Sequence, residues 1–183
     1  TRKNHQGVVA QMSTIAYASL DNVIDQCYAV GKAPLILVLD HLTDVRNFGA
    51  IARTAECAGV DAIVIPEKGS AQINSDAVKT SAGALNFIPV ARVKNLFYTC
   101  RDLQKMGLSL IAITEKTEKL MYEGDFASPV ALIMGSEEDG ISQEIMGMVD
   151  DKVRIPLAGN IESLNVSVSA GVAIYEAIRQ RKK

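Results

Sequence analysis

The sequence has 183 residues, which at roughly 100–200 residues per domain predicts a single domain. Hydrophobic residues make up 48% and charged residues 22% of the chain, an ordinary globular usage that excludes a disordered or fibrous protein. The 19 basic and 21 acidic residues give a formal net charge of -2, so overall charge makes no case for nucleic-acid binding, and any basic contact surface has to be local.

Cysteine and histidine usage is sparse. The three cysteines are widely spaced and form no CxxC pair, so the sequence predicts neither a zinc site nor a disulfide framework and favours a reducing cytoplasm. With only His5 and His41 as imidazole ligands, we expect no metal site. No apolar run reaches about 18 residues, so we expect no transmembrane helix.

Short apolar runs rich in β-branched residues alternate along the chain with amphipathic helical patterns. In chain order the expected elements are helix 20–27, strand 35–39, helix 48–55, strand 62–65, a weak strand 86–90, helix 95–106, strand 108–113, strand 130–134, helix 141–149, strand 153–155 and helix 166–178. Continuous apolar runs are typical of strands buried on both faces. The alternation predicts an α/β domain with a mostly parallel sheet, helices on both faces and right-handed crossovers.

Open α/β sheets bind ligands beyond the carboxyl ends of their strands, so the residues that follow each strand are the site candidates. The segment after the first strand, 40–49, has neither the GxGxxG fingerprint of dinucleotide-binding folds nor the GxxxxGK[ST] pattern of a P-loop. The predicted fold suits a nucleotide, but both usual phosphate-binding loops are absent.

The first unusually polar segment is 47–55, NFGAIARTA. Asn47 can cap the helix, and small residues one turn before Arg53 leave room for a bulky group beside its guanidinium. A purely structural interpretation, with a capping Asn47 and a surface Arg53 paired with Glu56 or Asp61, explains the spacing equally well.

The second segment is 134–142, MGSEEDGIS, directly after a predicted buried strand. Gly135 permits close backbone approach, and Gly140 supplies a flexible turn. A carboxylate between them can accept hydrogen bonds from a base, a ribose or an arginine. The alternative is a solvated acidic loop that stabilises the N-terminus of the following helix.

The third segment, 155–170, places Ser163 and Asn165 at the mouth of the last helix, after a glycine-bearing loop. Their polar groups either cap the helix or bind a ligand together with its N-terminus. The small residues that follow imply close backbone packing of this helix, either within the domain or across a dimer. Composition alone does not separate these interpretations.

Together these segments resemble the three signature motifs of the SPOUT methyltransferases, in the SpoU/TrmH branch of RNA ribose 2′-O-methyltransferases. The matching residues are 47–55, 133–142 and 155–169, in the family's order and at its usual separations, within a resemblance that covers about residues 34–180. The resemblance implies a Rossmann-like fold with a C-terminal trefoil knot, S-adenosyl-L-methionine bound in that knot, and a homodimer. General topology rules argue against a knot, so the resemblance alone carries that expectation.

The resemblance further implies methyl transfer to a ribose 2′-hydroxyl of structured RNA. Residues 5–8, HQGV, resemble the linker that precedes the catalytic domain in bacterial 23S rRNA guanosine 2′-O-methyltransferases. We therefore expect residues 1–12 to be a linker remnant and 13–183 the catalytic domain, separated from a small RNA-binding domain. The tRNA guanosine 2′-O-methyltransferases share all three motifs and remain the alternative.

Site residues carry over by the same resemblance. Those at the family's catalytic and substrate positions are Asn47, Arg53, Glu137, Ser163 and Asn165. Those expected to hold the cofactor are Thr114, Met134, Gly135, Ile155, Leu157 and Leu164. The sulfonium already activates the methyl group, so this chemistry requires no metal.

Arg53 is proposed in this family to accept the 2′-hydroxyl proton or to steer the ribose. Because arginine titrates above about pH 12, we expect Arg53 instead to bind a phosphate bidentately. Glu137 is expected to order the site by pairing with Arg53, and His41 to be structural. Further RNA contacts are expected from Arg46, Lys68, Lys79 and 179–183, the last of which also suits a helix C-terminus.

Two other functional classes stay open. A flavodoxin-like or dinucleotide-binding oxidoreductase would bind flavin or NAD, and the missing fingerprint argues against it. A non-catalytic RNA-binding module would have lost its activity, and the presence of all five residues at catalytic positions argues against that. Binding of S-adenosyl-L-methionine, NAD and FMN separates these classes.

Overall fold

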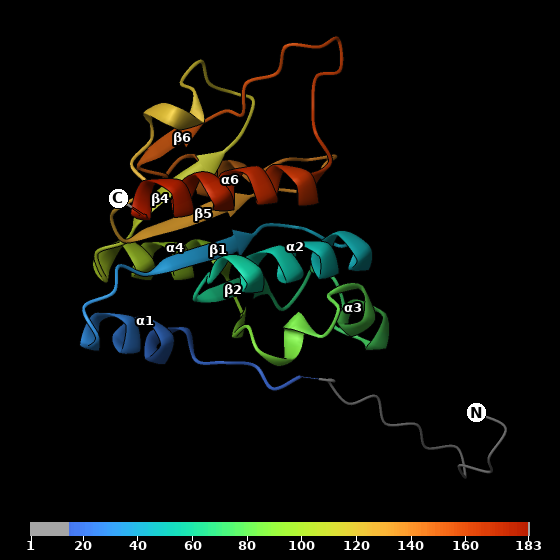
Figure 1. Ribbon diagram of the computed structural model, residues 1–183, viewed down its shortest axis with the longest axis vertical. Coiled ribbons are helices and arrows are strands. Elements are labelled where there is room, and N and C mark those ends of the chain that lie inside the picture. Colours follow the sequence, from blue (N-terminus) through green and yellow to red (C-terminus); the bar gives the residue numbers. More distant parts are fainter. Residues whose placement is uncertain (1–14, 183) are drawn as a thin grey trace, which may run out of the picture.

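The structure is a computed structural model that describes residues 15–182 (Figure 1), and residues 5–8 of the predicted linker lie outside that range. Its strands are β1 (Leu35–Leu39), β2 (Ala62–Pro66), β3 (Val90–Val93), β4 (Ser109–Ile113), β5 (Val130–Met134) and β6 (Asp151–Val153). Its helices are α1 (Leu20–Ala29), α2 (Val45–Ala58), α3 (Ser75–Thr80), α4 (Leu96–Lys105), α5 (Gln143–Met146) and α6 (Val166–Arg181). Two short 3-10 turns are η1 (Ala84–Asn86) and η2 (Met121–Glu123).

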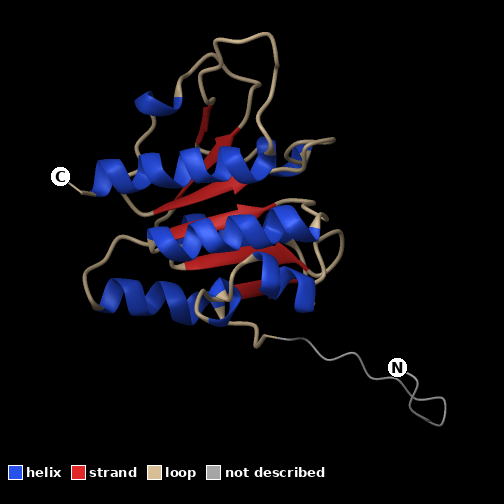
Figure 2. Ribbon diagram, turned by 45° about the vertical axis from the view of Figure 1, so that its right-hand side comes forward, coloured by secondary structure: helices blue, strands red, loops and turns tan. Residues whose placement is uncertain are grey.

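The strands form one sheet in the order β3-β2-β1-β5-β4-β6, and every pair of neighbours is parallel. Helices cover both faces: α2, α3 and α6 pack on one face, and α1, α4 and α5 on the other. Figure 2 shows α6, which leads to the C-terminus, and α2 in front of the strands. The predicted α/β class, with a mostly parallel sheet between two helical layers, is confirmed. The trefoil knot implied by the resemblance stays a prediction.

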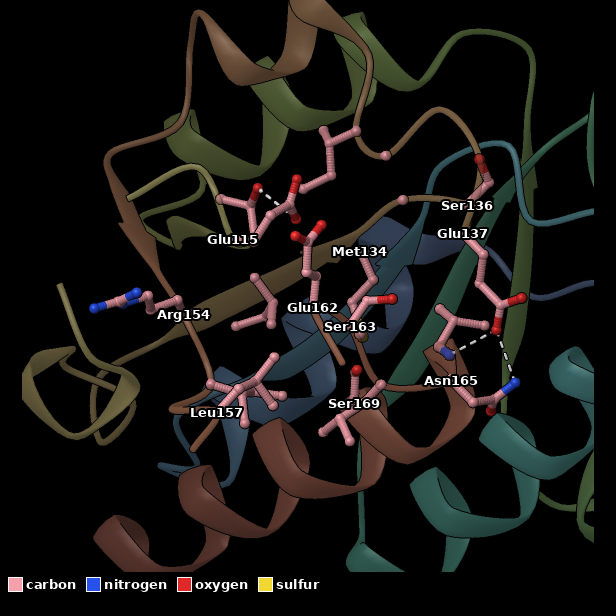
Figure 3. A pocket seen from close by; sticks show the side chains of 18 of the residues that line it. Glu115, Met134, Ser136, Glu137, Arg154, Leu157, Glu162, Ser163, Asn165 and Ser169 are labelled. Carbon is pink, nitrogen blue, oxygen red and sulfur yellow. Dashed lines mark hydrogen bonds between the residues drawn. The ribbon is translucent and has the colours of Figure 1, made fainter. Parts of the chain in front are cut away.

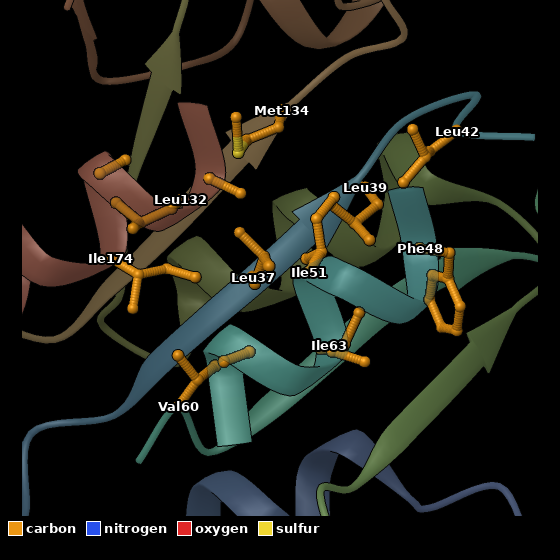
Figure 4. Close-up of a cluster of buried hydrophobic side chains, with 14 of the residues drawn as sticks. Leu37, Leu39, Leu42, Phe48, Ile51, Val60, Ile63, Leu132, Met134 and Ile174 are labelled. Carbon is orange, nitrogen blue, oxygen red and sulfur yellow. The ribbon is translucent and has the colours of Figure 1, made fainter. Parts of the chain in front are cut away.

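Strand β1 shows how the sequence directs the two layers. Successive side chains of a strand point to opposite faces, and all five residues of β1 are buried. Leu35, Leu37 and Leu39 belong to the cluster beneath α2 and α6, part of which Figure 4 shows. Ile36 and Val38 belong to the cluster on the opposite face. A continuous apolar run is therefore needed here, because both faces of the strand are covered.

The start of α2 corrects one prediction. Asp44, not Asn47, is the N-cap: its carboxylate accepts a hydrogen bond from the Asn47 N–H at 2.6 Å. Asn47 lies within the first turn of the helix. Gly49 makes room for α3 rather than for a group beside the Arg53 guanidinium, since a Cβ there would lie 2.7 Å from Cβ of Thr80.

Most predicted bounds shift by a few residues, and the largest differences concern the shortest elements. The weak strand at 86–90 is replaced by η1, and β3 begins only at Val90. The strand predicted at 153–155 is β6, two residues earlier, and the helix predicted at 141–149 shortens to α5, with Gly147 as its C-cap. Helix α3, which begins after the capping side chain of Asn74, was not predicted because six residues are too few to show helical periodicity.

The carboxyl edge of the sheet is where α2 and α6 begin. These two helices lie side by side across one face (Figure 1). The connections after β4 and β6 are long and stand above this edge. Over residues 15–182, no helix is long and apolar enough to cross a membrane. In the same part of the chain, no group of three or more His, Cys, Asp or Glu side chains is placed to hold a metal ion.

Candidate active site

A cavity of about 730 Å³ opens at the carboxyl ends of β4, β5 and β6 (Figure 3). Its walls come from 113–115 after β4, 134–141 after β5, 154–165 after β6, and the first turn of α6. Ligand pockets typically measure about 300–1,000 Å³, so this cavity has room for a molecule the size of a nucleoside cofactor.

The residues predicted to hold a cofactor come together although they lie on separate connections. All six line this one cavity: Thr114, Met134, Gly135, Ile155, Leu157 and Leu164. The parallel sheet is the physical reason, because it brings the carboxyl ends of β4, β5 and β6 to one edge. The Thr114 N–H extends the β4–β6 pairing by donating to the Val153 carbonyl at 2.9 Å.

The loop after β5 folds back on itself. A Cβ added to Gly135 would lie 1.9 Å from the carbonyl carbon of Gly140 and 2.3 Å from the backbone nitrogen of Ile141. Gly140 has φ +69°, and its N–H donates to the Ser136 carbonyl at 3.1 Å. The predicted close backbone approach at Gly135 is confirmed, but the approaching backbone belongs to the same loop.

One side-chain amide joins all three polar segments. Nδ2 of Asn165 donates to Oε1 of Glu137 at 2.7 Å and to Oδ1 of Asn47 at 3.0 Å. Glu137 points from the loop after β5 toward α6 (Figure 3), and its Oε1 also accepts the Val166 N–H at 3.0 Å. A carboxylate is stabilised at a helix N-terminus, where backbone N–H groups lack partners.

The predicted pair between Glu137 and Arg53 is wrong. In the described residues Glu137 takes its hydrogen bonds from Asn165 and Val166, and Arg53 forms no ion pair. Arg53 is exposed, and neither Arg53 nor Asn47 lines the cavity. Asn47 contacts the cavity residue Asn165, and Arg53 lies about 9 Å further along α2 at 1.5 Å per residue. The alternative partner Asp61 pairs instead with Lys32.

Asn165 caps α6 and also lies in the cavity wall, so the capping interpretation of the third segment is confirmed and ligand binding stays a prediction. Asn165 is the N-cap of α6, with Oδ1 accepting from the Ser167 N–H at 3.0 Å and from the Ser167 hydroxyl at 2.5 Å. It also lines the cavity, together with Ser163. Within residues 15–182 the Ser163 hydroxyl has no protein partner, so it is available to a ligand.

Sequence reasoning missed several polar side chains of the cavity wall. They are Glu115, Ser136, Arg154, Glu162 and Ser169. Two of them carried a usable signal. Glu115 follows the predicted strand 108–113, and Ser169 lies one helical turn after Asn165, on the same helix face.

Residues 34–175 match the model of the SpoU rRNA Methylase family. The chain belongs to this family. It is 40% identical over 178 residues to the 23S rRNA (guanosine-2′-O-)-methyltransferase RlmB of Vibrio parahaemolyticus, covering 97% of this chain and 72% of that protein.

Solved SpoU structures share the fold. The SpoU methyltransferase AviRb from Streptomyces viridochromogenes is 26% identical with a TM-score of 0.81, over 92% of this chain and 65% of that one. AviRb in complex with the cofactor AdoMet is 28% identical with a TM-score of 0.76, over 82% and 59%. The TrmH/SpoU tRNA modifying enzyme of A. aeolicus is 30% identical with a TM-score of 0.75, over 89% and 84%.

Proposed function

We propose that this SpoU chain transfers a methyl group from S-adenosyl-L-methionine to a ribose 2′-hydroxyl of RNA, and that its substrate is a guanosine of 23S rRNA. The cavity at the ends of β4, β5 and β6 carries the proposal, because the second and third family motifs line it and the first motif meets them through the Asn47–Asn165 hydrogen bond. Further support comes from the RlmB relative, which is named for this reaction, and from the AdoMet complex of AviRb.

The residues of the cavity fit this cofactor. Met134, Ile155 and Leu157 offer apolar surface for an adenosine group, while the carboxylates of Glu115 and Glu162 are available to hydroxyl or ammonium groups. When bound, S-adenosyl-L-methionine supplies a methyl group that its sulfonium already activates. We propose that the six residues predicted to hold the cofactor do so from this wall.

The protein's own contribution is to hold and align the attacking ribose, and positioning alone supplies several kcal/mol of a barrier. The Asn165 amide is already engaged by Glu137, Asn47 and Ser167, so we assign it to positioning. The amide nitrogen of Asn47 and the hydroxyl of Ser163 have no partner in the described structure. We propose that these two groups donate hydrogen bonds to the RNA near the cavity.

We assign Arg53 to a phosphate of the substrate. Its guanidinium is exposed on α2, without an acidic partner in residues 15–182, and a guanidinium binds phosphate bidentately. Arg46, Lys68 and Lys79 are also exposed on the α2 and α3 side of the molecule. Phosphate binding through these groups predicts RNA affinity that falls with salt.

We also propose that the enzyme is a homodimer that packs through α6. Val168, Val172 and Tyr175 are 50%, 38% and 54% exposed and form one stripe, because they lie four and seven residues apart. Sedimentation should show a dimer, and Val172→Arg should shift it toward monomer. We further propose a cytoplasmic location, which the free thiols of Cys27 and Cys100 favour.

Calorimetric titration with S-adenosyl-L-methionine, NAD and FMN tests the cofactor. We expect saturable binding of the first alone, and binding of NAD or FMN with no response to S-adenosyl-L-methionine would overturn the proposal. The substrate test compares methyl transfer to 23S rRNA and to tRNA, followed by mapping of ribose methylation. The tRNA arm is needed because the TrmH relative is a tRNA modifying enzyme.

A further inference from the structure

Asp40 is a buried carboxylate outside the cavity wall. It directly follows β1, its side chain is 2% exposed, and it does not line the cavity. Burying a carboxylate is costly unless its oxygens are hydrogen-bonded. Both are: Oδ1 lies 2.7 Å from Nδ1 of His41, and Oδ2 accepts the Ser142 N–H at 2.8 Å.

The partners of Asp40 stand at the two ends of the loop that follows β5. Its backbone N–H donates to the Met134 carbonyl at 2.8 Å, immediately before Gly135, and its side chain holds Ser142, where α5 begins. One residue therefore ties both the entry and the exit of the loop to the end of β1.

His41 contacts the Asp40 oxygen that Ser142 does not bond, Oδ1. Its backbone has φ +55°, a left-handed conformation that costs energy for a residue with a side chain. Gly69, in the connection after β2, leaves space for the ring: a Cβ there would lie 3.1 Å from Cδ2 of His41. The imidazole is thereby held between Asp40 and the neighbouring loop.

We infer that Asp40, oriented by His41, is a positioning residue that shapes the cofactor cavity by holding the loop 135–142 at both ends. This inference rests on the proposed function, because it deepens the role of the same cavity. The held loop supplies Gly135, Ser136 and Glu137 to the cavity wall. Release of the Ser142 end would let Glu137 move away from the N-terminus of α6.

Substitution of Ser142 offers the sharpest test. Ser142 has φ -56°, which proline adopts, and its side chain makes no capping hydrogen bond. Ser142→Pro deletes the N–H that Asp40 accepts, while Ser142→Ala retains it. We expect Ser142→Pro to raise the calorimetric Kd for S-adenosyl-L-methionine at least about tenfold, and Ser142→Ala to change it less than about twofold.

A second series addresses the carboxylate itself. Asp40→Ala should raise the Kd at least about tenfold, and Asp40→Asn should restore most of the affinity, because its amide oxygen can still accept the Ser142 N–H. Glu176→Ala is the matched control. Glu176 is also a buried carboxylate, 7% exposed, but it lies on α6 away from the cavity wall. Glu176→Ala should lower thermal stability without changing the Kd for S-adenosyl-L-methionine.

Amide hydrogen exchange of 135–142, measured without ligand, keeps the two proposals separable. If wild type does not bind S-adenosyl-L-methionine, the proposed function fails. Faster exchange in Asp40→Ala and Ser142→Pro would still support the inference that Asp40 holds the loop 135–142. Unchanged exchange and a Kd within twofold of wild type in both variants would overturn the inference that Asp40 holds the loop. So would an equal loss of affinity in Glu176→Ala. If Asp40→Ala does not fold, the comparison of Ser142→Pro with Ser142→Ala tests the inference on its own.

Discussion

The two halves of the sheet, β3-β2-β1 and β5-β4-β6, present their carboxyl ends at the same edge, yet only the second half forms the cavity. In the first half, 40–44 leads into α2, 67–74 into α3 and 94–95 into α4. In the second half, the cavity is walled by 113–115, by the loop after β5 and by the long connection 154–165. The parallel sheet brings all these connections to one edge, and those of the second half enclose the cavity.

The halves also differ in how they are held. Strand β1 is almost completely buried, whereas Leu157, Ile161 and Leu164 on the long connection after β6 are 43%, 77% and 36% exposed. Glu137 and Asn165 hold the cavity wall by hydrogen bonds rather than by deep packing. The central strands of both halves are buried, and the exposed connections of the second half form the cavity wall, as expected of ligand-binding loops drawn from less stable regions.

Arg53 offers the strongest way to break this comparison, because α2 packs on the half without the cavity. Arg53→Ala should lower kcat/KM for methyl transfer by about 10²-fold, the order of loss expected when the ribose is no longer held in line, while the Kd for S-adenosyl-L-methionine stays nearly unchanged. Radiolabel transfer to RNA and calorimetry measure the two quantities. Arg101→Ala, an exposed arginine of α4, is the control. Near wild-type transfer by Arg53→Ala would contradict the assignment.

Substitution of glycine by alanine at one position in each half of the molecule, Gly135 and Gly59, sharpens the comparison. Gly135→Ala forces a Cβ into the backbone of Gly140, so the loop must refold, and the Kd for S-adenosyl-L-methionine should rise by about tenfold or more. Gly59→Ala meets nothing within 4 Å but has φ +76°. It should cost about 1 kcal/mol of unfolding free energy and leave the Kd unchanged. Equal Kd values in the two variants would be evidence against a preformed loop.

A pair of helix caps separates stability from activity. Asn165 caps α6 and Asn95 caps α4 by accepting backbone N–H groups at 3.0 Å. Each Asn→Ala change should cost about 1 kcal/mol in urea unfolding. Only Asn165→Ala should also lower kcat/KM, by about tenfold, because it releases Glu137 and Asn47 as well. If Asn95→Ala reduces transfer equally, the effect of Asn165 is one of stability alone.

The smallest effect concerns the far end of α6. The guanidinium of Arg179, hydrogen-bonded to Glu176, lowers the pKa of that carboxyl below its ordinary value. A carboxyl whose pKa is lowered by folding stabilises the protein above its unfolded pKa, and this contribution disappears as the pH falls through the folded pKa. Glu176→Gln should therefore cost roughly 1 kcal/mol at neutral pH and progressively less on acidification. Urea unfolding across the acid range checks this, and a difference independent of pH would contradict it.

Much of the fold was predictable because its signals are local. The apolar runs at 35–39 and 130–134 coincide with β1 and β5, and Gly59 ends α2 as a left-handed C-cap. Short elements were less predictable: α3 has too few residues to show a period, and β6 was shifted by two residues. The six predicted cofactor residues converge on one cavity, although their binding role stays a prediction.

The sequence by itself determined the α/β class and the three segments that meet at the site, since each depends on residues close together along the chain. Only the tertiary structure decided that Glu137 bonds Asn165 and Val166 rather than Arg53, and that Asp40 reaches Ser142. Those partners come from distant segments, and crossover connections and helix packing determine which donors lie within hydrogen-bonding distance of a buried or loop-borne carboxylate.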